Sequence, residues 1–262
     1  MVLVVTLLAA LARAHTSTEA EGVRPTPPPA SSLTWTDGAA MVQNSGWNAS
    51  VARSPYARLP LAASSGGWCS PPCPVRAPVW KEGQNGAGLY LAFKTDAPSV
   101  VLNATLISQA AEATNCGVAC NTGVDMYAYD NRTSAWRWVS TAWPSPSSGG
   151  GWSWGGNVIY RAMVATDAAL QRRTTRYRIH LPIYNGLTAA AIGVPAGSTV
   201  SLDPPPTDQL PPVLFYGTSI VNGHVASRPG MIFTNVLSRA LARPVINLGF
   251  GGQGTMDPSI GR

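Results

Sequence analysis

Short apolar segments separated by turn residues dominate the first two hundred residues of the chain. The clearest lie at residues 89–93, 100–102, 124–129, 136–139 and 177–181. In the last, apolar residues alternate with Arg178 and His180, which predicts a strand with one dry face and one wet face, so we expect His180 to face solvent. Many short strands with almost no helical periodicity predict a jelly-roll-like β-sandwich over residues 33–203.

The pattern changes after residues 204–212, a proline-rich stretch that we interpret as a stiff linker. An apolar strand at 213–216 leads into a sharp turn at Gly217-Thr218-Ser219. Apolar positions then recur with helical spacing between 232 and 241, and a second apolar strand follows at 245–248. This order predicts a β-α-β unit of a parallel sheet, with Ser219 at the carboxyl end of its first strand, where open α/β sheets bind ligands.

Three motifs follow in order within this unit. They are Tyr216-Gly217-Thr218-Ser219-Ile220, the Ala-Ser-Arg-Pro-Gly-Met run at 226–231, and the Ile-Asn-Leu-Gly-Phe-Gly-Gly-Gln-Gly run at 246–254. Together they resemble the SGNH hydrolases, most closely the type-3 GDSL-like lipases and esterases. The resemblance implies an α/β/α flavodoxin-like domain in which Ser219 is the nucleophile. It also implies that the backbone N–H groups of Ser219 and Gly252 bind the oxyanion, and that no metal or organic cofactor is needed.

A second resemblance covers the strand-rich region. Gly123-Val124-Asp125-Met126-Tyr127 resembles the Gly-x-Asp-Leu-Tyr signature of the β-sandwich domain that precedes the type-3 hydrolase domain, and residues 181–186 and 192–195 resemble the end of that domain. Methionine replaces leucine at 126, a change that conserves volume. Asp125 lies within a strand, so we expect it to make buried hydrogen bonds rather than to do chemistry.

The resemblance of the C-terminal motifs to the type-3 hydrolases places two catalytic elements beyond Arg262. They are an asparagine that donates to the oxyanion and an Asp-x-x-His that supplies the base and its orienting carboxylate. We therefore interpret residues 213–262 as the incomplete N-terminal part of a hydrolase domain, and expect the chain as given to lose nearly all turnover. His224 follows Ser219 by five residues, but the family pattern gives it no role.

Several features indicate a secreted or luminal protein. Residues 1–14 read as a cleaved signal peptide and 15–32 as a flexible Pro/Ser-rich segment. No later stretch suggests a membrane anchor. The disulfide candidates are Cys69, Cys73, Cys116 and Cys120, whose three possible pairings the sequence leaves open, and the spacing is unusual for zinc. Acceptor sequons for N-glycosylation begin at Asn48, Asn103 and Asn131.

Charge narrows the choice of partner. The formal net charge is +6, but only 11% of residues are charged and the arginines are scattered, which argues against nucleic acid. The leading hypothesis is a secreted serine ester hydrolase acting on acyl esters of carbohydrates or other small molecules. Two alternatives stay open: a carbohydrate-binding β-sandwich that uses some of its nine tryptophans, and an acyltransferase that excludes water.

Overall fold

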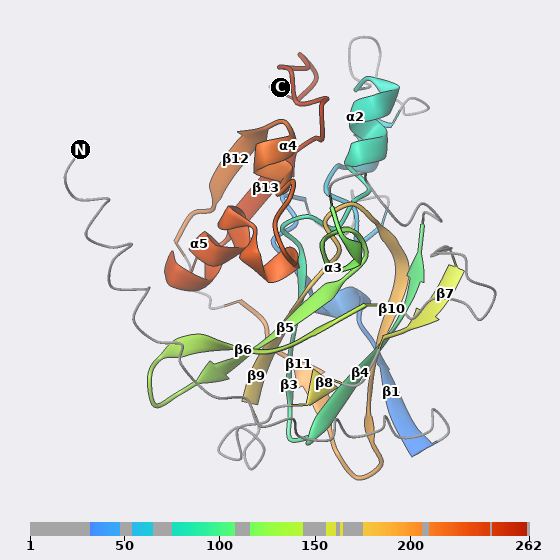
Figure 1. Cartoon of the computed structure of the whole chain (residues 1–262), viewed down its shortest axis with the longest axis vertical. Coiled ribbons are helices and arrows are strands. Elements are labelled where there is room, and N and C mark those ends of the chain that lie inside the picture. The colour runs from blue at the N-terminus through green and yellow to red at the C-terminus, as the bar shows by residue number, and fades with distance from the viewer. Residues whose placement is uncertain are drawn as a thin grey trace.

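The computed structural model describes residues 32–47, 54–64, 75–107, 116–143, 156–160, 163–164, 175–205, 210–241 and 243–260. Strands dominate this part of the chain and helices are few and short (Figure 1). The expectation of a mostly β chain is confirmed. We call residues 32–205 the β region and residues 210–260 the C-terminal unit. The predicted signal peptide, Cys69, Cys73 and Asn48 lie outside the described residues.

One antiparallel sheet of the β region has the strand order β1-β10-β4-β7, and β8 also pairs with β4. These strands are β1 (Leu33–Asp37), β4 (Ser99–Leu106), β7 (Gly156–Ile159), β8 (Met163–Val164) and β10 (Leu187–Pro195). Ile192 lies opposite Leu102 in the register of β10 and β4, and both are fully buried. Alternate residues of these central strands therefore form one dry face.

The second antiparallel sheet has the order β11-β3-β9-β5-β6, and β2 pairs with β3. Its strands are β2 (Val42–Gln43), β3 (Tyr90–Thr95), β5 (Val124–Asp130), β6 (Ala135–Ala142), β9 (Thr175–His180) and β11 (Val200–Leu202). Leu91, Met126 and Ile179 from this sheet share a single core with Leu102 and Ile192 from the first. The two sheets therefore bury their inner faces against each other.

Short helices complete the β region. They are η2 (Ala39–Met41), η3 (Leu61–Ala63), α2 (Ala77–Glu82) and α3 (Val118–Asn121). Among the described helices, none has the length and apolar character needed to cross a membrane.

The C-terminal unit contains β12 (Val213–Gly217), α4 (Ser219–Asn222), η4 (Pro229–Met231), α5 (Phe233–Leu241) and β13 (Val245–Gly249). The two strands pair in parallel, with Val213 opposite Val245 and Gly217 opposite Gly249, so both strands end at the same level. On one face of this pair, Phe215 packs edge-on against Phe233 of α5, with ring centroids 5.1 Å apart.

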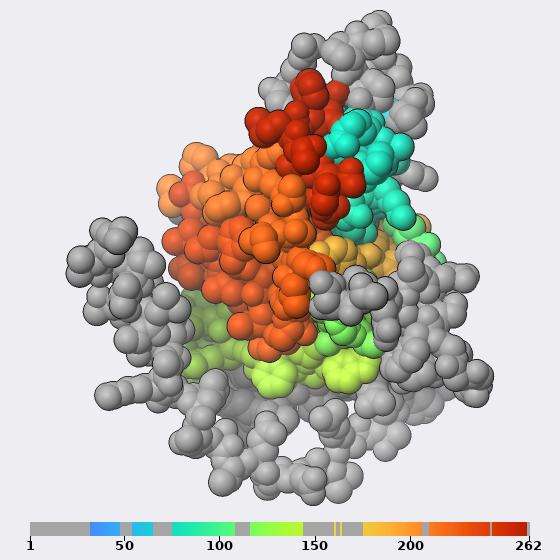
Figure 2. Space-filling view, turned by 45° about the horizontal axis from the view of Figure 1, so that its top comes forward, coloured from blue at the N-terminus to red at the C-terminus, as the bar shows by residue number. Residues whose placement is uncertain are grey.

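Part of the β region covers the other face of β12 and β13. We call residues 54–64 and 75–89 the α2 segment. Leu59 and Val79 of this segment form a buried cluster with Leu248 and Phe250 of the C-terminal unit. Figure 2 shows the end of the chain, in red, lying against the α2 segment, in cyan. The strand pair thus has a helix on each face, as a parallel sheet requires, although one helix comes from far away in the sequence.

The prediction that His180 faces solvent is wrong. Its side chain is completely buried, and its Nε2 lies 2.9 Å from Nη1 of Arg239 on α5. The rings of Tyr90 and Tyr127 each pack edge-on against it at 5.5 Å. The alternation in β9 was interpreted correctly, but the face expected to be wet is covered by the C-terminal unit.

Candidate active site

Ser219 begins α4 directly after the sharp turn that ends β12. Thr218, the residue between strand and helix, has φ −93° and ψ −141°. A side chain at Gly217 would bring its Cβ within 2.7 Å of Val221, so the turn needs a glycine at that position. The Ser219 residue is partly exposed, and its Oγ forms no hydrogen bond with any described residue. The hydroxyl is therefore free to meet a ligand.

The loop after β13 lies against this turn. The Phe250 N–H donates to the Gly217 carbonyl at 2.9 Å, and a Cβ at Gly254 would collide with that same carbonyl. Because β12 and β13 end at the same level, the loop at 250–254 and the turn at Ser219 lie together at the carboxyl end of the strand pair.

Gly252 lies exposed within this loop. Its φ is +66°, a left-handed conformation that favours glycine, and a Cβ there would have open space around it. Its N–H donates to no other described residue. The site thus combines a free hydroxyl with unpaired backbone N–H groups at the start of α4 and in the neighbouring loop. A nucleophile and the donors of an oxyanion hole have this chemistry.

A buried asparagine, Asn247, connects the serine turn and the loop after β13 by hydrogen bonds. Asn247 Nδ2 donates to the Val221 carbonyl at 2.7 Å and to Thr234 Oγ1 at 3.0 Å, and its Oδ1 accepts the Gly249 N–H at 2.8 Å. It therefore ties the end of β13 to both α4 and α5. Sequence reasoning gave it no role, but a polar residue between Ile246 and Leu248 in an apolar strand was a usable signal.

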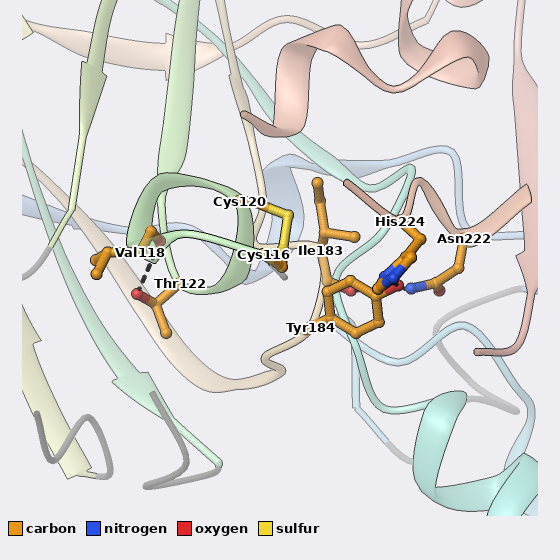
Figure 3. Close-up of a disulfide and its surroundings, with 8 residues drawn as sticks. All are labelled: Cys116, Val118, Cys120, Thr122, Ile183, Tyr184, Asn222 and His224. Atoms are coloured by element: carbon orange, nitrogen blue, oxygen red, sulfur yellow. Dashed lines mark hydrogen bonds between the residues drawn. A yellow bond between two sulfur atoms is a disulfide. The ribbon is translucent and has the colours of Figure 1, made fainter. Parts of the chain in front are cut away.

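The β region contributes polar side chains beside the loop. Tyr184 Oη lies 2.6 Å from His224 Nδ1, and their rings pack edge-on (Figure 3). The Glu82 carboxylate accepts a hydrogen bond from Asn85 Nδ2 at 3.0 Å and lies next to the Gly251 backbone. Burial raises the pKa of both Tyr184 and Glu82. Sequence reasoning gave neither residue a role: Glu82 belongs to no motif, and Tyr184 lies in the 181–186 motif, which was interpreted only as the end of the β-sandwich domain.

His224 follows α4, and its backbone N–H donates to the Ser219 carbonyl at 2.8 Å. Within the described residues, its side chain forms no hydrogen bond with the Ser219 hydroxyl. Its Nδ1 is instead engaged by Tyr184. The arrangement gives no support to His224 as the base for this serine.

Asp125 makes buried hydrogen bonds, as predicted. Its Oδ1 accepts from Trp138 Nε1 and Thr141 Oγ1, each at 2.8 Å, while its Oδ2 accepts from Arg228 Nε at 3.0 Å and the Gly230 N–H at 3.1 Å. Burial raises its pKa, against the attraction of Arg228. The signature aspartate therefore joins the second sheet to the C-terminal unit.

The tryptophans on β6 have structural partners. Trp138 is 52% exposed, but its indole N–H is bound to Asp125 and the Arg228 guanidinium lies 5.4 Å from its ring centroid. Trp136 contacts the guanidinium groups of Arg176 and Arg178 at 5.7 and 4.2 Å from its centroid. Both tryptophan rings therefore have partners within the protein, which explains their positions without a bound sugar.

A hollow of about 420 Å³ lies away from Ser219. Trp47, Tyr90, Pro212 and Pro244 are among the residues that line it. The two prolines precede β12 and β13, so the hollow lies near the amino ends of these strands, opposite the serine turn. In the described part of the chain, no group of three or more His, Cys, Asp or Glu side chains is placed to hold a metal ion.

The described residues include two of the four disulfide candidates and two of the three glycosylation candidates. Cys116 and Cys120 form a disulfide beside Ile183 (Figure 3). The disulfide, Ile183 and Ile232 belong to one small core between the β region and the C-terminal unit. Asn131 is exposed in the turn between β5 and β6. Asn103 lies within β4 and has a buried Oδ1.

Comparisons with known proteins identify the family to which a chain with this fold and serine turn belongs. Residues 33–200 match the family model described as the N-terminus of Esterase_SGNH_hydro-type, and residues 211–262 match the GDSL-like Lipase/Acylhydrolase family. The first match covers more than half of the chain. The chain belongs to the SGNH-hydrolase-type esterases that carry the GxDLY N-terminus.

One solved structure shares the fold of most of this chain. A GDSL-like lipase from Bacteroides ovatus ATCC 8483 matches 87% of this chain, with a TM-score of 0.68 and 22% identity. The salicylyl-acyltransferase SsfX3 from a tetracycline biosynthetic pathway matches 90% of the chain, with a TM-score of 0.49 and 17% identity. The chain spans 59% and 56% of these two proteins. A search of curated proteins gave no match.

Proposed function

We propose that Ser219 is the nucleophile of a secreted ester hydrolase that acts on acyl esters of carbohydrates or other small molecules. The observation that carries the proposal is the free Ser219 hydroxyl at the carboxyl end of β12, beside the glycine loop at 250–254. In this proposal the β region is a jelly-roll-like β-sandwich, and the C-terminal unit is the first β-α-β unit of a flavodoxin-like domain.

In the first step, Ser219 Oγ attacks the ester carbonyl and loses its proton to a base. The carbonyl oxygen becomes an oxyanion, which the backbone N–H groups of Ser219 and Gly252 stabilise. Collapse of this intermediate releases the alcohol and leaves an acyl-enzyme, which water then hydrolyses. No step needs a cofactor.

We propose that the base and its carboxylate partner come from chain downstream of Arg262. His224 is bound to Tyr184, and the described residues offer Ser219 no other imidazole partner. A chain with the nucleophile but without its base retains little activity. Residues 1–262 alone should therefore be nearly inactive, and activity should appear in a protein extended by the downstream reading frame.

Labelling with a fluorophosphonate tests the proposal in the extended protein. The wild type should be labelled, and Ser219→Ala should not. Ser227→Ala is the matched control because Ser227 is an exposed serine in the same unit, outside the turn. Equal labelling of wild type and Ser219→Ala would refute Ser219 as the nucleophile.

A transferase would use the same serine and differ in the second step. Adding an alcohol acceptor during turnover and analysing the products separates the two reactions. Free acid as the main product supports hydrolysis, whereas a new ester that forms in preference to acid shows transfer.

A further inference from the structure

Arg58 is a buried arginine of the α2 segment that reaches under both loops of the candidate active site. The residue is 2% exposed. Its backbone is fixed at both ends: its N–H donates to the Gly83 carbonyl at 2.8 Å, and its carbonyl accepts from Trp47 Nε1 at 3.0 Å. The backbone of Arg58 is thus held by hydrogen bonds within the β region, independently of the C-terminal unit.

The guanidinium binds both elements that carry the proposed chemistry. Nη1 donates to the Gly249 carbonyl at 2.6 Å, directly before the loop that contains Gly252. Nη2 donates to Asn222 Oδ1 at 3.0 Å, on the four-residue helix that begins with Ser219. One planar group therefore sets the distance between the two elements.

The remaining donors are also used. Nε donates to the Asn85 carbonyl at 3.0 Å, Nη2 also donates to the Glu82 carbonyl at 2.7 Å, and Nη1 lies 3.2 and 3.3 Å from the two oxygens of Asn247. Only the planar fork of arginine can satisfy acceptors in so many directions.

All these acceptors are neutral, and Arg58 forms no ion pair with a described residue. Burial lowers its pKa to about 10, although Glu82 nearby partly opposes the shift, so the group stays charged at neutral pH. A buried cation without a paired anion is costly to the fold. An apolar side chain of similar size would leave these buried acceptors without a donor, so the hydrogen bonds of Arg58 are needed once the acceptors are buried.

We propose that Arg58 is a positioning residue, which fixes the turn at Ser219 relative to the oxyanion loop at 250–254. The proposal rests on the proposed function of Ser219. Small displacements of a nucleophile relative to its oxyanion donors reduce reaction rates steeply. The β region is then a working part of the hydrolase rather than a separate module.

The test uses the extended protein with Arg58→Met, Arg58→Lys and Asn222→Ala. The readouts are the rate of fluorophosphonate labelling of folded protein, kcat and KM with p-nitrophenyl acetate, and the melting temperature. Arg58→Met should lower the labelling rate and kcat by about 10- to 100-fold, with KM changed less than threefold. Arg58→Lys should recover part of the loss. Asn222→Ala, which removes the link from Arg58 to α4 together with a weak hydrogen bond to the Ile183 carbonyl at 3.5 Å, should lower kcat in the same direction.

Arg239→Met is the matched control. Arg239 is another interface arginine, which donates to the Gly230 carbonyl at 2.7 Å and contacts His180, but it does not contact the turn or the oxyanion loop. It should lower the melting temperature while the labelling rate of folded protein stays within about threefold of wild type.

Two outcomes would overturn the positioning role. One is wild-type labelling and kcat in folded Arg58→Lys and Asn222→Ala. The other is an equal loss in Arg239→Met at equal stability, which would show a general effect of loosening the interface. If Ser219→Ala is labelled like wild type, the proposed function fails instead, so the two failures are distinguishable.

Discussion

Asp125 accepts the backbone N–H of Gly230 at 3.1 Å, across the junction between β5 and the C-terminal unit. Asp125→Asn keeps the shape but removes the charge that faces Arg228 and replaces one acceptor with a donor. We expect a loss of about 2–3 kcal/mol in the free energy of unfolding. Denaturant unfolding measures it. Asp37→Asn is the control, because Asp37 is exposed and should lose less than about 0.5 kcal/mol. An equally small loss for Asp125→Asn would contradict the structural role.

Local pattern predicted the strands well because alternation of apolar residues reports one buried face directly. The serine turn was found from its glycine and its place after an apolar strand. Arg58 could not be found this way, since Tyr56-Ala57-Arg58-Leu59 has no periodicity. Its acceptors in the C-terminal unit lie between 164 and 191 positions later in the chain. His180 was assigned to solvent for the same reason: its cover comes from α5, which local sequence does not reveal.

His180 should make the fold sensitive to acid. Burial, with the nearby Arg239 and Arg178, holds its pKa well below the ordinary value of 6.5. Below pH 6.5, His180 binds a proton in the unfolded chain but not in the folded chain. The free energy of unfolding therefore falls as pH falls. The expected slope from this group is about 1.4 kcal/mol per pH unit. Urea unfolding at pH 7.0, 6.0 and 5.0 measures it.

His180→Gln should flatten this dependence between pH 6.5 and 5.0. Tyr90→Phe is the control, because it alters the same ring cluster without removing an imidazole. A His180→Gln protein whose stability still falls with the wild-type slope would show that other groups cause the acid sensitivity.

The disulfide between Cys116 and Cys120 should contribute modestly to stability. It closes a loop of only a few residues, for which the chain-entropy model gives about 2 kcal/mol. Replacing both cysteines with serine should lower the melting temperature, and thermal unfolding at constant pH measures the change. A loss well above about 4 kcal/mol in the free energy of unfolding would instead indicate that packing against Ile183 and Ile232 contributes more than the covalent link.

Glycosylation should distinguish the two described sequons if the protein passes through a secretory pathway. Asn131 is exposed in a hairpin turn, whereas Asn103 lies within β4, between β10 and β7, with its Oδ1 buried. We expect a glycan on Asn131 and none on Asn103. Mass spectrometry of peptides from protein secreted by eukaryotic cells tests this, with Asn131→Gln as the control. A glycan on Asn103 would show that β4 is modified before it folds.

Two glycines of the candidate site should respond differently to alanine. At Gly249 a Cβ would lie 2.0 Å from the Asn222 backbone nitrogen, so Gly249→Ala must separate β13 from α4. At Gly252 the Cβ would meet nothing, and the left-handed φ of +66° should cost only about 1–2 kcal/mol. Alanine keeps the N–H at position 252. In the extended protein we therefore expect Gly249→Ala to lose both stability and fluorophosphonate labelling, and Gly252→Ala to retain most labelling.

Gly117→Ala is the control for these substitutions, because position 117 also has open space and its φ is −61°. It should change neither melting temperature nor labelling appreciably. If Gly249→Ala behaves like Gly117→Ala, the close approach of β13 to α4 is not needed to hold Ser219. If Gly252→Ala abolishes labelling in a protein that stays folded, the loop is less tolerant than its open surroundings indicate, and the left-handed backbone itself sets the direction of its N–H group.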